Sequence, residues 1–291
     1  MAQKLKIALP KGSLQEPTLK LLEKAGYNIY ASSRGLRPTS DDAELDIYMI
    51  RAQEIGRYMD QGFVDCGITG YDWAYENEVD LVDLGELAYS RASTRPTRWV
   101  LVVPEDSPVK SVKDLAGKRI ATEGVGITKR YLANKGVEAD VECSWGATEV
   151  KVPDLVDAIV DVTETGSSLR ANKLRIVDEI LVSFPHLYAN PSSYEDAWKK
   201  EKIDRIAMML KGALHARDKV GLKMNLPENS LPEVLERLPS LRRPTVSPLA
   251  DGGWVAVETI IEESVARHLI PDLKDLGAEG IIEYPLNKIV P

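Results

Sequence analysis

Short apolar runs alternate with amphipathic stretches in the first part of the chain. Leu5–Leu9 and Leu45–Ile50 are apolar runs of strand length, and each precedes a stretch with apolar residues at helical spacing. We expect two further strands at Val64–Thr69 and Leu81–Leu84. Because single helices separate these strands, the pattern predicts a parallel sheet whose carboxyl-terminal edge carries ligand sites.

A second series of strands and helices begins at Trp99. The predicted strands are Trp99–Val103, Arg119–Thr122, Val137–Cys143, Ala158–Val162 and Ile176–Val182. The proline-containing stretches Ser90–Pro96 and Phe184–Ser193 interrupt the pattern, so we interpret them as two linkers that cross between lobes. A long helix from about Ser193 to Ala216 follows. Two small α/β lobes joined by crossovers form the layout of the type II periplasmic-binding-protein fold.

The last part of the chain has a different order of elements. Its hydrophobic pattern predicts β-α-β-β-α-β, which is the ferredoxin-like arrangement. The expected domains are one lobe from residues 1–92 and 184–216, a second lobe from residues 93–183, and a C-terminal module from residues 217–291. The module carries no obvious catalytic set, so a purely oligomeric role is one interpretation.

Composition narrows the class of protein. The 291 residues carry 37 Lys and Arg against 45 Asp and Glu, a net charge of −8, which argues against a broad nucleic-acid-binding surface. The two cysteines cannot form a disulfide framework. We find no signal-peptide core and no apolar stretch long enough to span a membrane. We therefore expect a soluble, cytoplasmic protein that binds neither nucleic acid nor membrane.

The segment Asp157–Leu174 carries the clearest candidate chemistry. A strand ends in a polar turn around Gly166, and the turn leads into a helix whose first N–H groups can bind an anion. Glycine allows close approach of a phosphate, and hydroxyl-bearing residues surround it. Asp161 and Glu164 would repel a bare phosphate, but they suit ribose hydroxyls or a phosphate bridged by Mg²⁺. The alternative is an ordinary helix N-cap made by Thr165 or Ser167.

Three other turns have weaker signals. Lys11 follows the first strand, where it could meet a phosphate or simply be solvated. Asp72 lies at the start of a helix. An Asp at that position usually does no more than interact favourably with the positive end of the helix dipole. The turn Thr122–Gly126 is rich in glycine, but a single Gly-x-Gly is weak evidence. The three histidines show no zinc spacing.

Asp157–Leu174, with the sequence DAIVDVTETGSSLRANKL, resembles the phosphoribosyl-pyrophosphate motif of the ATP phosphoribosyltransferases, the first enzymes of histidine biosynthesis. The resemblance extends over the chain through LPKGSL at Leu9–Leu14, DCGITGYD at Asp65–Asp72, RIATEG at Arg119–Gly124, KRYLANKG at Lys129–Gly136 and RPTVSPLAD at Arg243–Asp251. The C-terminal module resembles that of the long form of the family, which is hexameric and carries its own regulatory domain.

The resemblance implies a pentosyltransferase that joins ATP to 5-phosphoribosyl 1-pyrophosphate with Mg²⁺ and releases pyrophosphate. It places catalysis at Asp161 and Glu164, and it leaves the metal ligands open. It places phosphoribosyl-pyrophosphate binding at Asp161, Thr163, Glu164, Thr165, Gly166, Ser167, Ser168 and Leu169. It places ATP binding at Lys11, Gly12, Ser13, Arg51 and Asp72.

Regulation is a further implication of the resemblance. L-histidine would inhibit from a pocket in the module, and the family positions are Asn225, Leu241, Arg243, Thr245 and Gly280. The implied assembly is a homohexamer, with a dimer of lower activity as a second state. A non-enzymatic solute-binding or regulatory ligand-binding module is the alternative, since such proteins share the two-lobed layout.

Overall fold

The strands form two five-stranded sheets and one four-stranded sheet, with a separate two-stranded ribbon, and they include strands that the sequence did not predict. The computed structural model describes residues 3–30, 37–90, 95–239, 243–250 and 252–290. One compact unit comprises Met1–Glu23 and Tyr27–Ala207, and the other comprises Lys24–Gly26 and Met208–Pro291. The domain bounds given above stay a prediction.

The first sheet builds lobe I. Its strands run in the order β4 (Leu45–Arg51), β1 (Leu5–Lys11), β5 (Cys66–Gly70), β12 (Pro185–Ala189) and β6 (Val82–Glu86). The lobe's helices are α1 (Gln15–Ala25), α2 (Ala52–Asp60) and α3 (Tyr71–Asn77), and its ribbon pairs β2 (Ile29–Tyr30) with β3 (Thr39–Ser40). β1 is parallel to β4 and β5, as predicted, so their carboxyl ends lie at one edge.

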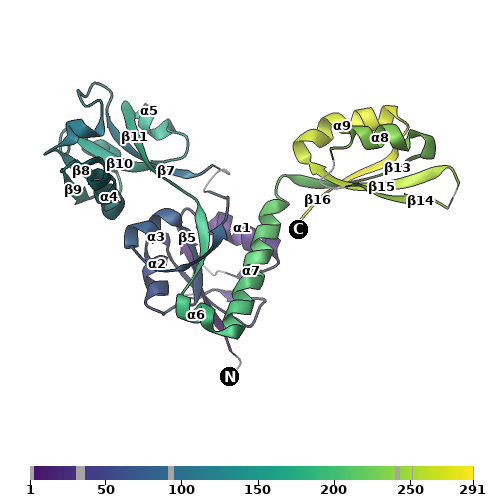
Figure 1. Cartoon of the computed structure of the whole chain (residues 1–291), viewed down its shortest axis with the longest axis horizontal. Coiled ribbons are helices and arrows are strands. Elements are labelled where there is room, and N and C mark those ends of the chain that lie inside the picture. The colour runs from purple at the N-terminus through teal and green to yellow at the C-terminus, as the bar shows by residue number, and fades with distance from the viewer. Residues whose placement is uncertain (1–2, 31–36, 91–94, 240–242, 251, 291) are drawn as a thin grey trace. The chain divides into compact units, whose positions relative to one another are not determined.

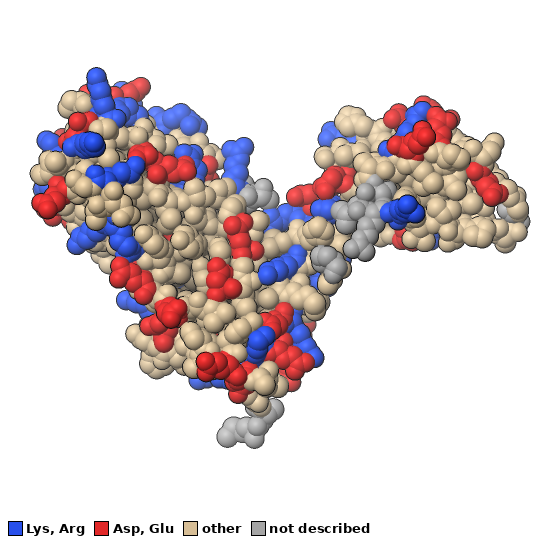
Figure 2. All heavy atoms as spheres, in the orientation of Figure 1, with Lys and Arg blue, Asp and Glu red and all other residues tan. Residues whose placement is uncertain are grey.

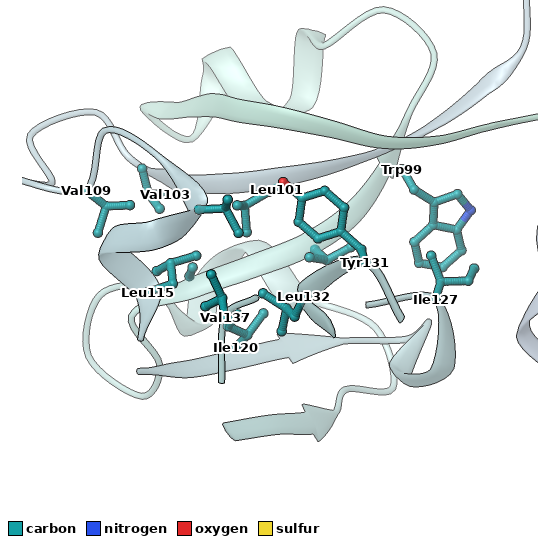
Figure 3. Close-up of a cluster of buried hydrophobic side chains, with 13 residues drawn as sticks. Trp99, Leu101, Val103, Val109, Leu115, Ile120, Ile127, Tyr131, Leu132 and Val137 are labelled. Carbon is teal, nitrogen blue, oxygen red and sulfur yellow. The ribbon is translucent and has the colours of Figure 1, made fainter. Parts of the chain in front are cut away.

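The second sheet builds lobe II. Its order is β11 (Leu174–Ser183), β7 (Thr97–Pro104), β10 (Ala158–Thr163), β8 (Arg119–Thr122) and β9 (Asp140–Cys143). The helical segments are η1 (Val112–Leu115), α4 (Val125–Lys135), η2 (Thr148–Lys151) and α5 (Ser167–Ala171). The lobe packs around a buried cluster in which Trp99 lies at one end, beside Ile127 (Figure 3).

Neither sheet is purely parallel, and this corrects the expectation from alternation. The stretch Phe184–Ser193 is not only a linker, because it contains β12 and the short helix α6 (Pro191–Glu195). β12 runs antiparallel to both neighbours, and β7 runs antiparallel to β10 and β11. Pro185 hid the strand from a pattern reading, yet proline is tolerated as the first residue of a strand. Helix α7 (Ala197–His215) follows.

The C-terminal module has the predicted ferredoxin-like topology. Its elements are β13 (Lys219–Pro227), η3 (Glu228–Ser230), α8 (Leu231–Arg237), β14 (Thr245–Pro248), β15 (Trp254–Glu262), α9 (Glu263–Asp275) and β16 (Glu279–Pro285). The sheet order is β14-β15-β13-β16, all antiparallel. Figure 1 shows α8 and α9 on one face of this sheet, and the core lies beneath them. The predicted fold class, two α/β lobes with a ferredoxin-like module, is confirmed.

Surface charge and helix hydropathy agree with the composition. On the face drawn in Figure 2, basic and acidic side chains are interspersed and form no broad basic area. Among the described residues, no helix combines the length and the apolar character needed to cross a membrane.

Candidate functional site

The segment after β10 has the geometry of an anion-binding turn. β10 ends at Thr163 and α5 begins at Ser167, and the backbone at Gly166 has φ +71°, a left-handed conformation that favours glycine. The Gly166 N–H donates to Thr163 Oγ1 at 2.7 Å, which closes the turn. No side chain caps the start of α5, so its first N–H groups remain available to a ligand.

Hydroxyl groups surround this turn, which we call the phosphate turn (residues 163–168). Thr165 Oγ1 and Ser167 Oγ lie 3.0 Å apart, and both side chains are exposed. Thr165 Oγ1 accepts from the Ser167 N–H at 3.4 Å, a long contact that does not satisfy the helix start. The N-cap alternative therefore has little support. Ser168 Oγ donates to Glu149 Oε1 at 2.9 Å, and Glu149 is a residue that sequence reasoning missed.

Asp161 lies among acidic side chains at the carboxyl edge of the sheet. Thr122 of β8 pairs with Val160 of the parallel strand β10. The next residues along the two strands, Glu123 and Asp161, therefore lie at the same height along the sheet. Burial, together with the nearby charges of Glu149 and Glu123, raises the pKa of Asp161 to about 6. The Val162 N–H donates to Asp161 Oδ1 at 2.7 Å. No cation in the described part of the chain pairs with this carboxylate, which suits a hydroxyl-rich or cation-bridged ligand.

The other phosphate-turn residues contribute in different ways. Ser90 Oγ donates to Glu164 Oε2 at 3.1 Å, which joins the turn to the segment entering the first crossover. Leu169 is buried in the core, so only its backbone could reach a ligand. The structure therefore brings the predicted phosphoribosyl-pyrophosphate residues together, although not every side chain is free to face a substrate.

Two cations lie side by side at the matching edge of lobe I. Lys11 of β1 is the register partner of Arg51 at the end of β4. Both side chains are exposed, and neither has an ion-pair partner among the residues that the structure describes. Gly12 turns the chain at φ +93°, and Ser13 beside it is exposed. Adjacent unpaired cations on such an edge suit a polyphosphate.

Asp72 has a different environment from the one expected of an exposed ATP ligand. Its Oδ2 accepts from Trp99 Nε1 at 2.8 Å, and its backbone N–H donates to Ser183 Oγ at 3.0 Å. Burial raises its pKa. Trp99 belongs to β7 and Ser183 ends β11, so Asp72 contacts both strands that connect lobe II to lobe I. A direct contact with ATP would require Trp99 to move.

The glycine-rich turn before α4 is already occupied by a protein carboxylate. The N–H groups of Gly126 and Ile127 donate to the two Glu76 oxygens at 2.9 and 2.7 Å. A Cβ on Gly124 would lie 2.7 Å from the Trp99 ring. The glycines of this turn therefore serve packing and the contact with α3 of lobe I, and they do not form a free anion site.

The two halves of the candidate site belong to one arrangement. Gln53 in the first turn of α2 donates from Nε2 to Glu123 Oε1 at 3.1 Å. Gln53 is two residues from Arg51, and Glu123 influences Asp161. This hydrogen bond links the cationic edge of lobe I to the acidic edge of lobe II. The site therefore presents cations on one side and an anion-binding turn with acids on the other.

The expected effector positions do not gather into one pocket of the module. Asn225 pairs with Glu279 in the β13–β16 ladder, so it neighbours Gly280. Thr245 lies on β14 at the opposite edge, and Arg243 precedes it. With strands ~4.8 Å apart, Thr245 on β14 is ~14 Å from the strand of Gly280 and ~10 Å from the strand of Asn225. Leu241 lies outside the described residues.

Comparison with known proteins gives a consistent result over the whole chain. A family model described as ATP phosphoribosyltransferase matches residues 51–212, and one described as the HisG C-terminal domain matches residues 216–288. An ATP phosphoribosyltransferase from Chlorobaculum parvum is 59% identical over 98% of this chain and 97% of its own length. Another, from Thermodesulfovibrio yellowstonii, is 57% identical over 99% of this chain and 98% of its own length.

A solved structure resembles part of the chain. It is a chain of the ATP phosphoribosyl transferase (HisG:HisZ) complex from Thermotoga maritima, with 30% sequence identity and a TM-score of 0.60. The similarity covers 71% of this chain and 98% of that one.

Proposed function

The chain belongs to the ATP phosphoribosyltransferase family, which catalyses the first step of histidine biosynthesis, and from this premise we propose which residues bind the two substrates. The phosphate turn after β10 binds 5-phosphoribosyl 1-pyrophosphate. The carboxyl-terminal edge of the lobe I sheet binds the triphosphate of ATP. The observation that carries this proposal is the uncapped start of α5 behind a left-handed glycine.

The reaction itself demands placement more than a protein nucleophile. N1 of adenine forms a bond to C1 of the ribose, while the bond from C1 to the pyrophosphate oxygen breaks and its electron pair leaves with pyrophosphate. Catalysis therefore needs the two substrates held in line and their charges balanced. An acidic side of the site helps as positive charge develops on the ribose ring.

For phosphoribosyl pyrophosphate, the support comes from the phosphate turn. The N–H groups at the start of α5 and the hydroxyls of Thr165 and Ser167 bind the 5-phosphate. Asp161 accepts hydrogen bonds from the ribose hydroxyls, and Glu164 contributes a second carboxylate near the reacting carbon. Thr163 and Ser168 hold the shape of the turn through their own hydrogen bonds.

For ATP, the support comes from the paired cations. Lys11 and Arg51 contact the triphosphate, and the backbone at Gly12 and Ser13 allows its close approach. Asp72 belongs to this side through its hold on Trp99, which makes it a positioning residue rather than an exposed ligand.

Magnesium is part of the proposal, and the residues present fit it in a limited way. Among the described residues, no three His, Cys, Asp or Glu side chains are placed to hold a metal ion. The acids around Asp161 provide the hard oxygen donors that Mg²⁺ prefers, so they fit an ion held mainly by the substrate's pyrophosphate and by water. Bound Mg²⁺ supplies charge neutralisation to the leaving pyrophosphate.

We further propose that L-histidine inhibits the enzyme through the module, and that the working assembly is a homohexamer with a less active dimer. Gly280 lies on the edge strand β16 of the module sheet and Asn225 on the neighbouring inner strand β13, whereas Arg243 and Thr245 lie at the opposite edge. We place the pocket where two modules meet, so that one amino acid contacts both groups. Histidine binding and assembly are therefore coupled in this proposal.

The test of the phosphate turn compares two glycines with the same backbone strain. Gly166 has φ +71°, and Gly117 has φ +70° in a turn with open space around it; a Cβ at Gly166 would lie 3.0 Å from Arg170 Nη1, the end of a flexible side chain that can shift. Valine at either position costs about 1–3 kcal/mol of strain, so both variants should lose similar stability. Only Gly166→Val should lose kcat/KM for phosphoribosyl pyrophosphate, by about a hundredfold or more, because its side chain enters the phosphate position.

Thermal unfolding of both variants checks that the strain is matched. Steady-state kinetics with each substrate varied in turn then give the result. Equal losses in Gly166→Val and Gly117→Val, or near wild-type kcat/KM in Gly166→Val, would contradict the assignment of the turn.

A further inference from the structure

Trp145 is an unusually placed tryptophan. Its side chain is 85% exposed, whereas Trp99 is buried and the other three tryptophans are at least partly covered. An indole is large and mostly apolar, and such surface is normally covered by something. Trp145 is therefore a candidate contact for a ligand or a second protein surface.

The sheet topology shows where the residue lies. β8, β9 and β10 are parallel, and Cys143 at the end of β9 is level with Thr122 and Val160. Trp145 is two residues beyond Cys143, so it lies at the carboxyl edge from which Asp161 and the phosphate turn also project. The indole thus shares an edge with the proposed ribose-phosphate site.

Two sets of contacts hold the Trp145 loop against that site. Ser144 Oγ and Thr148 Oγ1 lie 2.9 Å apart across the loop, and both residues are buried. Glu149 directly follows and accepts from Ser168 Oγ of the phosphate turn at 2.9 Å. The loop is therefore anchored at both ends, and it is fixed to the turn that receives the ribose phosphate.

The backbone of the loop keeps the indole outside the core. Gly146 and Ala147 have φ +78° and φ +49°, so two successive left-handed residues form a tight turn directly after Trp145. A left-handed alanine is uncommon and costs free energy that the surrounding contacts must supply. This turn presents the exposed indole at the same sheet edge as the ribose site.

We propose that Trp145 stacks on the adenine of ATP and so places N1 for attack on the ribose. The proposal rests on the proposed substrate sites: the triphosphate lies on Lys11 and Arg51, and the ribose lies on the phosphate turn. The base must then lie between the two lobes, next to the ribose carbon that it attacks. A flat indole at that edge binds any purine face by stacking.

Substitutions with two readouts test this. Trp145→Ala should raise KM for ATP roughly tenfold while KM for phosphoribosyl pyrophosphate changes less than twofold, and Trp145→Phe should restore most of the loss. Leu155→Ala is the matched control, since Leu155 is 60% exposed in the same segment but close to the start of β10, at the opposite edge. This control should behave as wild type.

Fluorescence gives a readout that a merely structural role would not change. ATP should protect tryptophan emission from acrylamide quenching in the wild type, inorganic tripolyphosphate should not, and Trp145→Phe should lose the ATP effect. An unchanged KM for ATP in Trp145→Ala would overturn the proposal. So would equal increases in both KM values, or a change in assembly size, which would indicate contact with another copy.

The result is separable from the phosphate-turn test. If Gly166→Val keeps its activity but Trp145→Ala loses ATP affinity, the ribose-phosphate assignment fails and base stacking stands. If Gly166→Val behaves as expected and Trp145→Ala leaves KM for ATP unchanged, the stacking inference alone fails.

Discussion

Asp161 combines a functional position with an unfavourable environment for a charged group. Burial, with a smaller contribution from the charges of Glu149 and Glu123, raises its pKa to about 6. Between its ordinary pKa and this raised pKa, the folded protein binds more protons at this site than the unfolded chain does. The contribution of Asp161 to stability therefore falls as the pH rises from about 4 to 6, and it stays low above that range.

Asp161→Asn removes the cost of this buried charge. We expect the variant to be more stable than wild type at pH 7.5 by on the order of 1 kcal/mol, after allowance for partial solvent access, and equally stable near pH 4. Its kcat/KM for phosphoribosyl pyrophosphate should fall, because a charged hydrogen bond to the ribose is lost. Urea unfolding at the two pH values, without ligand, measures the difference. An unchanged or reduced stability at pH 7.5 would contradict the assignment of the raised pKa.

The acidic limb of the activity profile provides an independent check. If the ionised form of Asp161 binds the ribose, kcat/KM for phosphoribosyl pyrophosphate should rise as the pH passes through about 6. Asp161→Asn should lack that rise. Asp178 is a suitable control, because its pKa is lowered by a hydrogen bond from Tyr131, so Asp178→Asn should keep the acidic limb of wild type.

For single residues, roles that depend on neighbours in the same segment could be predicted from the sequence better than contacts between distant segments. The phosphate turn could be found because a strand, a glycine and a helix start lie within one continuous segment. Asp72 was assigned to the ATP side for the same kind of reason, but its carboxylate binds Trp99 in another sheet. Glu149 and Glu76 gave no signal, because each acts on a segment far away in the sequence.

Single elements were predicted well where apolar residues dominate them. The parallel strands of both lobes agree with their apolar runs, because buried strands need apolar side chains on both faces. β12 was hidden within the stretch that we interpreted as a linker. Its prolines and polar ends suggested a loop, but pairing with β5 and β6 stabilises it as an inner strand. The antiparallel direction of β7 and β12 arises because the chain crosses between the lobes at these strands. The local sequence pattern does not specify such crossovers.

Helix α4 depends on a residue from the other lobe. Glu76 accepts from the first N–H groups of α4, which no side chain of α4 itself caps. Glu76→Ala should cost about 1–3 kcal/mol, because it leaves two part-buried donors unpaired. Glu16→Ala is the control: among the described residues Glu16 pairs with exposed Lys20, and the loss of such an exposed pair should change stability very little. Urea unfolding of both variants measures the difference, and equal costs would contradict the capping role.

At the scale of the whole molecule, the proposed substrate-binding residues and the proposed histidine-binding residues lie in different parts of the chain. The lobes contain every residue proposed to bind substrate, and the module contains every residue proposed to bind histidine. Inhibition at a distance requires histidine to prefer one global state, since equal affinity for two states shifts neither. The proposed site lies where module edges meet, so assembly provides two such states.

The last prediction separates histidine binding from catalysis. Asn225→Ala should raise the histidine concentration needed for half inhibition about tenfold, as expected when a hydrogen bond to the proposed ligand is lost. Lys223→Ala is the matched control, because Lys223 lies two residues away on the same face of β13 and should leave inhibition within twofold of wild type. Deleting all residues after Ala216 should abolish inhibition altogether. Since the deletion can also disrupt the proposed hexamer and lower activity, each protein is scored against its own uninhibited rate, and its mass in solution is measured alongside. A truncated enzyme that is still inhibited at the wild-type histidine concentration would show that histidine acts at the catalytic lobes and that the module only assembles the enzyme.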